Sequence, residues 1–304
     1  MSTIKAKDNA ISQVFQKTYD NTSPGDWQDL VTNLTVTKKK VTLPFLGGSA
    51  AMREFKGEAD ARFLLDADYS ILTKAYHDTV KIDEFALETD DIGLYRPNFE
   101  LCARNAKDYP RILVLALLNA AFSGKDYTGS AFIAANKKHI CDEEGKPVDG
   151  YKTFTNLLTG ALTAEKLMEA KAMLQNMTNP YGVNLGLGTT IPTLIVPPSL
   201  EFAAMKIVKD YEGNVTSGVA KVKVMPGLTS QTAWFLADLD NPVKPLVLNT
   251  ASPVRHSSNA LDLLKEERTE ESMRTHMYVF QVFARWGAGY GASTRIVGSQ
   301  GTGS

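Results

Sequence analysis

The feature that most constrains this fold is a long helix-forming stretch between residues 94 and 123. Apolar side chains recur there at helical spacing, and Pro97 suits the first turn, where a backbone nitrogen needs no helical partner. Pro110 is expected to kink the helix, or to end one helix and start another, and Gly124 supplies a stop. Because the run is apolar around much of its circumference, it must be covered on several sides. We therefore expect it to be the central packing element of a domain.

The rest of the sequence alternates between helical and extended patterns without a regular period. A second helix is predicted over 163–177, with Thr163 as its N-cap, and a third over 199–209, with Ser199 as its cap. We expect an α+β fold rather than a doubly wound parallel sheet. Strands are predicted at 191–196, where a double proline ends the run, and at 220–225, 233–237, 245–249 and 276–286, the last of them an inner strand with two apolar faces.

Two segments in the N-terminal part of the chain are candidates for contact with another surface. An amphipathic stretch that contains Val14 and Phe15 is either the first helix of a domain or an arm that docks on a neighbouring molecule. Two β-capable runs, 36–43 and 76–85, flank a polar middle with a glycine pair, which predicts a long hairpin. Such a hairpin should lie on another surface, because two strands alone bury little apolar area.

Charge and cysteine content exclude several classes of protein. The formal net charge is −1 over 304 residues, so the chain carries no overall basic footprint for phosphate binding. Its two cysteines, Cys102 and Cys141, are too few for a disulfide framework and indicate a reducing compartment. We expect no signal peptide and no transmembrane segment, because no apolar run approaches about 20 residues. We therefore expect a soluble protein made in the cytoplasm.

The candidate catalytic and ligand-binding motifs lack the residues or the spacing that their chemistry requires. The glycine-rich run 182–190 lacks the lysine of a phosphate-binding loop and leads into a strand where such loops open a helix. His139, Cys141 and the acids at 142–144 are too close in sequence to converge on a metal ion. His256 and Ser257 come without a nucleophile elbow or an orienting acid. We expect no catalytic residue, no cofactor and no metal.

Several segments resemble the major head subunits of Mu-like phages. The most specific is the stretch 79–119, where TVKI and a phenylalanine lead through DDIGLYRPNF into the long helix. The segment 127–133, followed by His139, is similar to the family's Asp-Gly-x-x-Phe-Phe…His pattern. The segments 244–248 and 283–291 resemble its closing strands. In this order the resemblance covers roughly residues 36 to 292, and the N-terminal stretch shows no match.

The resemblance implies the HK97-like capsid fold, an α+β fold with an arm, an extended loop and two domains. In this numbering the N-terminal arm would be 1–35, the extended loop with the first peripheral strands 36–90, the peripheral domain with its spine helix 91–154, the axial domain 155–250, and the return to the peripheral domain with the C-terminal tail 251–304. The thin hairpin would then gain its burial on an adjacent subunit.

The same resemblance implies a structural role, not an enzyme. The chain would be the major capsid protein of a tailed bacteriophage or prophage, forming hexamers and pentamers of an icosahedral shell around double-stranded DNA. Its partners would be further copies of itself, a scaffold protein, a portal and decoration proteins, with DNA contacted non-specifically and no membrane. It would be made in the host bacterial cytoplasm and reside in the virion. The residues expected at contacts between subunits are Val14, Phe15, Lys38, Lys39, Lys40, Phe45, Arg53, Phe55, Tyr181 and Leu185.

Two alternatives remain open at this point. A nanocompartment (encapsulin-like) shell protein shares the fold and would differ by loading cargo proteins and by a shell empty of nucleic acid. A cytosolic α+β enzyme would use the glycine-rich loop of 182–190 and would remain a monomer with a small-molecule ligand.

Overall fold

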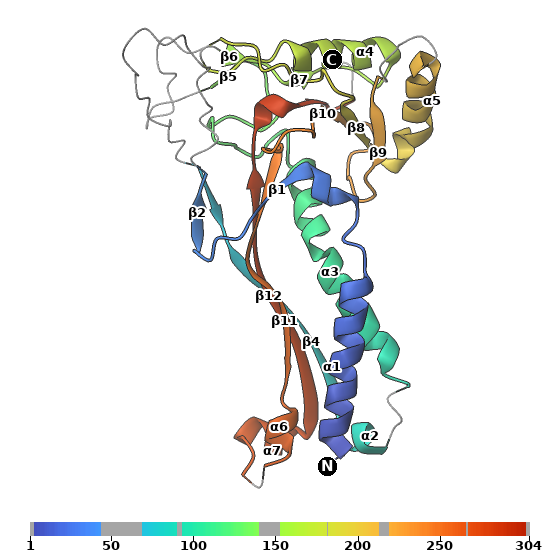
Figure 1. The fold of residues 1–304 in the computed structure, drawn as a ribbon, viewed down its shortest axis with the longest axis vertical. Coiled ribbons are helices and arrows are strands. Elements are labelled where there is room, and N and C mark those ends of the chain that lie inside the picture. Colours follow the sequence, from blue (N-terminus) through green and yellow to red (C-terminus); the bar gives the residue numbers. More distant parts are fainter. Residues whose placement is uncertain are drawn as a thin grey trace, which may run out of the picture.

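A computed structural model describes residues 3–43, 69–89, 93–139, 153–180, 182–212, 219–265 and 267–301. The molecule is elongated, with a broad part that holds one sheet and a narrow stalk that holds another (Figure 1). The long elements α1 (Thr3–Asn21), α3 (Arg96–Asn119), β11 (Leu246–Ser258) and β12 (Met277–Tyr290) run along the stalk. No helix in the described ranges combines the length and the apolar character needed to cross a membrane.

A four-stranded sheet with the order β1-β11-β12-β4 forms one side of the stalk. The strand β1 (Val31–Leu34) runs parallel to β11, whereas β11, β12 and β4 (Lys74–Asp83) are antiparallel to one another. Along β12 buried and more exposed side chains alternate, so one face of the sheet packs inward. The prediction that 276–286 forms an inner strand is confirmed, because β12 pairs on both sides.

The long helix is confirmed, and of the two alternatives for Pro110 the one in which one helix ends and another starts there is wrong. Helix α3 runs from Arg96 to Asn119 with Pro110 inside it. Pro110 itself is buried, and the side chains before and after it contribute to the core, so packing along the whole length keeps the helix in one piece. Helix α1 packs against α3 and the sheet through Phe15, which contacts Phe280 at a ring distance of 5.5 Å, while Phe99 of α3 contacts the same ring at 5.2 Å.

The predicted long hairpin between 36–43 and 76–85 is wrong in its pairing. Strand β2 (Lys40–Thr42) pairs with β3 (Ser70–Leu72), and β4 pairs with β12 along ten residue pairs from Met277↔Asp83 to Trp286↔Lys74. The reason is burial, because Val41 and Ile71 are both buried and pack together against Val247. The middle of the predicted hairpin, 44–68, lies outside the described residues.

A five-stranded sheet fills the broad part, in the order β7-β13-β10-β8-β9. Its core holds the helices α4 (Ala164–Gln175) and α5 (Glu201–Glu212) against the sheet. Its strands are β7 (Leu157–Leu158), β8 (Thr193–Val196), β9 (Lys221–Val224), β10 (Trp234–Ala237) and β13 (Ile296–Ser299). The sheets cut across the predicted domain ranges, since β13 from the predicted return segment pairs with β10 of the predicted axial segment.

One of the two predicted helix caps is confirmed. The Thr163 side chain accepts a hydrogen bond from the Lys166 amide at 3.2 Å and caps α4. Ser199 does not cap α5, because it lies inside the short 3₁₀ turn η3 (Pro198–Leu200) and its hydroxyl donates to the Gln231 carbonyl at 2.5 Å. Helix α5 begins only after this turn, at Glu201.

Short elements complete the chain. They are η1 (Asp26–Leu30), α2 (Glu84–Thr89), β5 (Lys137–Lys138), β6 (Thr153–Phe154), α6 (Ala260–Leu263), α7 (Glu270–Thr275) and η4 (Ser293–Arg295). The charged run at 265–271 leads into α7, whose N-cap Thr269 accepts a hydrogen bond from the Ser272 amide at 3.4 Å. It lies at the narrow end of the stalk (Figure 1).

Candidate assembly surfaces

The predicted contact residues fall into three groups. Lys38, Lys39 and Lys40 are exposed, and their side chains form no hydrogen bond or ion pair with the described part of the chain. Val14, Phe15 and Leu185 pack, at least in part, inside their own subunit. Phe45, Arg53, Phe55 and Tyr181 lie outside the described residues.

Helix α1 is held to its own subunit by apolar and polar contacts. Phe15 is 1% exposed and contacts the ring of His256 at 5.1 Å. The Tyr278 hydroxyl donates to Asp8 Oδ1 at 2.7 Å, and burial together with this carboxylate raises the pKa of Tyr278. These contacts favour the first of the two readings left open for this stretch, a helix of the domain. The arm assignment of 1–35 and an inter-subunit role for Val14 stay predictions.

The β2–β3 ribbon packs directly against glycines of β12. An added Cβ on Gly289 would lie 2.6 Å from Ile71 Cγ1, and one on Gly287 would lie 2.9 Å from Ile71 Cγ2. Strand β3 therefore approaches β12 more closely than any side chain would allow. The ribbon projects from the flank of the molecule, with β2 on the left in Figure 1.

A buried polar network that the sequence did not reveal orders the segment after α3. The Lys137 side chain is 0% exposed and donates to Asp126 Oδ2 and, at 2.9 Å, to the Phe132 carbonyl. Asp126 Oδ1 also accepts from the Thr128 amide at 2.9 Å and from its hydroxyl at 2.6 Å. The Lys137 ammonium lies 5.4 Å from the Phe154 ring centroid. A lysine is rarely buried, so nothing in a single sequence marks this one.

Burial in this network favours ionisable side chains that are neutral or paired with an opposite charge. Burial lowers the pKa of Lys137, and the Asp126 carboxylate opposes that shift. Burial, and then the charge of Lys137, lower the pKa of His139 to about 4, so its imidazole is neutral at pH 7. The lysine and the carboxylate are both closed to solvent, which gives a substrate no access to them. The network is therefore a structural element that ties the chain together.

The three glycine amides of the glycine-rich loop are bonded within the subunit. The Gly182 amide donates to the Asn179 carbonyl at 2.9 Å, and the Gly186 amide donates to Asn184 Oδ1 at 2.7 Å. Gly182, Gly186 and Gly188 have positive φ values, and the Gly188 amide donates to Asp238 Oδ2 at 2.8 Å. Asp238 is 3% exposed, so a buried carboxylate occupies the place where a phosphate-binding loop would receive its ligand. This geometry speaks against the nucleotide-using alternative.

The other candidate motifs serve packing or lie partly outside the described residues. The His256 ring stacks on Phe280 at 5.5 Å, and burial lowers its pKa. Cys141 and the acids at 142–144 lie outside the described residues. Among the residues that the structure describes, no three His, Cys, Asp or Glu side chains gather as a metal site.

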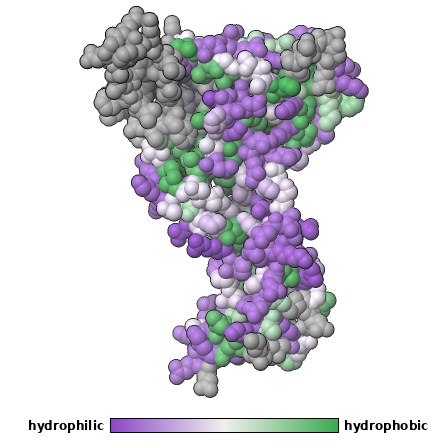
Figure 2. Space-filling model, in the orientation of Figure 1, coloured by the Kyte–Doolittle hydropathy of each residue, from purple (hydrophilic) through white to green (hydrophobic). Residues whose placement is uncertain are grey.

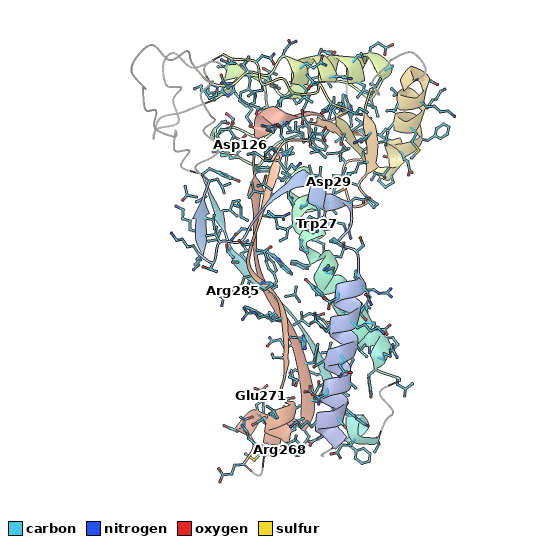
Figure 3. All side chains as sticks on the ribbon, in the orientation of Figure 1. Trp27, Asp29, Asp126, Arg268, Glu271 and Arg285 are labelled. Carbon is cyan, nitrogen blue, oxygen red and sulfur yellow. The ribbon has the colours of Figure 1, made fainter. Side chains whose placement is uncertain are left out.

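Ion pairs connect distant segments at both ends of the stalk. Figure 3 labels one residue of each pair, Arg268 at the narrow end and Asp29 at the other. Arg268 binds Glu84 with both guanidinium nitrogens, Nη1 to Oε2 at 2.8 Å and Nη2 to Oε1 at 2.9 Å. Hydrogen bonding to Arg268 lowers the pKa of Glu84. At the other end, Lys223 of β9 pairs with Asp29 of η1 at 2.8 Å, which joins the five-stranded sheet to the segment beside Trp27.

Large apolar side chains stay exposed at both ends of the molecule. Phe202 and Met205 of α5 are 82% and 50% exposed in the broad part. At the narrow end the exposed ones are Phe85, Leu94, Leu101, Leu261, Leu264 and Met273. Green patches on the broad part and at the narrow end are visible in Figure 2. Where such side chains form a large contiguous patch, they mark a surface that another molecule covers.

Comparison with known proteins gives a consistent picture. The family model described as "Mu-like prophage major head subunit gpT" matches residues 4–160, 150–228 and 210–302. The chain is 25% identical over 142 residues to the Mu-like prophage FluMu major head subunit of Haemophilus influenzae, covering 47% of this chain and 46% of that one. It is 26% identical over 117 residues to the major capsid protein of Escherichia phage Mu, covering 38% of each. The chain thus spans less than half the length of these curated relatives.

Solved structures show the fold. The chain resembles a subunit from the procapsid of bacteriophage JBD30 with a TM-score of 0.58 and 19% identity, covering 97% of this chain and 75% of that one. It resembles a subunit from the capsid of cyanophage P-SCSP1u with a TM-score of 0.53 and 10% identity, covering 92% and 88%. The predicted α+β, HK97-like capsid fold is confirmed.

Proposed function

The chain belongs to the Mu-like prophage major head subunit family, and from this premise we propose that it is a major capsid protein of a tailed phage or prophage. The observation that carries the proposal is the family match, which extends from residue 4 to residue 302. The fold shared with phage capsid subunits supports it independently. In this role the chain assembles with copies of itself into hexamers and pentamers of an icosahedral shell around double-stranded DNA.

The shape of the subunit suits repeated contacts with neighbours. The stalk and the broad part expose apolar side chains at opposite ends, so each copy has more than one surface to bury. Heterologous contacts between different patches close into rings when the rotation is right. Many modest contacts then hold the shell together collectively.

The predicted parts keep their proposed roles within this picture. Segment 1–35 is the arm, 36–90 the extended loop with the first peripheral strands, and 91–154 the peripheral domain whose spine helix is α3. Segment 155–250 is the axial domain, and 251–304 returns to the peripheral domain. The support is that α3 and the stalk sheet pack together while α4, α5 and the strands between them form the broad part. A scaffold protein, a portal and decoration proteins are the further partners, and the virion is the location.

Electron microscopy of the purified protein tests the proposal. Rings, shells or tubes are the expected result, and a stable monomer at high protein concentration would contradict it. Nucleic acid inside shells purified from infected or induced cells separates a phage head from a nanocompartment, which would carry cargo proteins instead.

Deleting residues 44–68 tests the extended loop. Strands β2 and β3 should be kept and joined by a short glycine linker, because Val41, Leu43 and Ile71 are buried. We expect a folded monomer with the wild-type circular dichroism spectrum and no assembly. A deletion variant that unfolds would show that this segment belongs to the core.

A further inference from the structure

The buried pair of Lys137 and Asp126 holds an amine against a carboxyl group inside one subunit. Both side chains are 0% exposed, and Lys137 Nζ donates to Asp126 Oδ2. Two reacting groups that the fold keeps in contact behave as if each were present at a very high concentration. The pair is therefore placed to form a bond between the two side chains.

The surroundings of the amine favour its uncharged form. The Phe132 ring centroid lies 5.7 Å from Lys137 Nζ and the Phe154 centroid lies 5.4 Å from it, and both phenylalanines are buried. Burial lowers the pKa of Lys137, although the Asp126 carboxylate opposes the shift. An uncharged lysine amine is a nucleophile, and desolvation in an apolar site is one way in which proteins activate it.

The two oxygens of the Asp126 carboxyl group have different partners. Oδ1 accepts hydrogen bonds from the Thr128 amide at 2.9 Å and from the Thr128 hydroxyl at 2.6 Å, whereas Oδ2 faces Lys137 Nζ. When an amine adds to Asp126 Cγ, negative charge develops on Oδ1, where these two donors are already in place to stabilise it. Oδ2, which faces the hydrogens of the amine, is then the oxygen that leaves.

We propose that Lys137 and Asp126 of the folded subunit condense to an amide. One proton passes from the Lys137 ammonium to Oδ2, and the free amine adds to Asp126 Cγ to form the C–N bond. A second proton passes from the nitrogen to Oδ2, the bond between Cγ and Oδ2 breaks, and Oδ2 departs as water. No oxidation takes place and no further reactant is consumed.

The product fits the hydrogen bonds that the fold already provides. The hydrogen that stays on Nζ can donate to the Phe132 carbonyl, which Lys137 Nζ contacts at 2.9 Å. Oδ1 becomes the amide oxygen and keeps both bonds from Thr128. Two buried charges disappear, and keeping such charges away from water is costly even when they are paired. The amide closes residues 126–137 into a covalent ring directly after α3.

Mass spectrometry of the full-length protein tests the inference. The folded wild type, measured after denaturation, should weigh less than its sequence by the mass of one water molecule. Protein kept in urea from the time of cell lysis should have the full mass and should lose the water on refolding.

A tryptic digest locates the bond. Trypsin should cut after Lys125 and Lys138 but not after Lys137, and the peptide 126–138 should carry the whole loss of mass. A loss of water at any other place in the chain leaves the cleavage after Lys137 intact, so the digest distinguishes the two.

Matched variants test the role of each group. Lys137→Arg keeps a cation but should have the full mass, whereas Lys138→Arg, at the less buried neighbouring position, should lose water like the wild type. Thr128→Val removes one of the two donors to Oδ1 and should slow the loss of water during refolding by at least about tenfold. Circular dichroism shows whether each variant folds.

The wild type alone decides the question if a variant does not fold. Full mass in the folded wild type, together with normal cleavage after Lys137, would overturn the inference and leave the pair as a permanent ion pair. A loss of water at peptide 126–138 that persists in Lys137→Arg would also overturn it. The proposed capsid role does not depend on either result, because assembly is measured separately.

Discussion

At the scale of single residues, Lys137 departs most from what its side chain usually does. Removing a partner from a buried ion pair leaves the other charge uncompensated. Lys137→Met should therefore destabilise the subunit by about 3–5 kcal/mol, because the Asp126 carboxylate would stay buried. Urea unfolding of the unassembled protein measures the change.

Its controls lie next to it. Lys138→Met, at the neighbouring and less buried position of β5, should change stability by no more than about 0.5 kcal/mol. Combining Lys137→Met with Asp126→Asn should restore part of the lost stability. The substitution removes the buried negative charge, and the Asn amide oxygen can still accept hydrogen bonds from Thr128. Equal effects of the two lysine substitutions would contradict a structural role for the buried pair.

His139 makes stability depend on pH in a defined window. Its pKa is about 4 in the folded protein and near 6.5 when unfolded, so only the unfolded chain takes up a proton as the pH falls between these values. Stability should drop on acidification from pH 6.5 to pH 4, by at most about 1.4 kcal/mol per pH unit from this residue. His139→Phe should flatten that part of the profile relative to the wild type. His77→Asn, which removes an exposed histidine of β4, is the control for loss of a histidine elsewhere in the subunit.

At the scale of elements, the packing of the β2–β3 ribbon on β12 depends on Gly289, which has no side chain. Gly289→Ala would bring a methyl group to 2.6 Å from Ile71, and relieving that clash should cost about 1–3 kcal/mol. Because the ribbon and the turn that leads into it also carry the predicted contact residues Lys38, Lys39 and Lys40, the variant should assemble less well while α3 and the stalk sheet persist. The combination with Ile71→Ala makes room and should recover stability. Thermal unfolding and hydrogen exchange of β2 and β3 measure both effects.

Across the whole molecule, the exposed apolar ends predict a separation of assembly from stability. Phe202 is 82% exposed, so Phe202→Ser should change the free energy of unfolding of the monomer by about 0.5 kcal/mol or less. Its assembly, followed by light scattering, should need a higher protein concentration if α5 lies in an interface. Normal assembly of both Phe202→Ser and Phe85→Ser would show that neither apolar end is used.

The local sequence pattern was enough to predict the elements in which apolar residues recur at a regular spacing. The spacing of apolar residues predicted α3 and α4, the Thr163 cap and the inner strand β12, since each depends on neighbours a few residues away. The segment 79–119 also indicated the family, which the comparison confirmed. The spacing of apolar residues along an element indicates which of its faces is buried.

Tertiary structure decided what each face is buried against. Strand β4 pairs with β12 rather than with the run at 36–43, and α3 continues through Pro110, because contacts from residues far away in the chain outweigh the local preference. Lys137 is buried because Asp126, Phe132 and Phe154 enclose it together, and no one of them is near enough in sequence to predict it. Sequence alone therefore determined the elements and the family, and only the packed molecule decided their partners and the surfaces left for a neighbour.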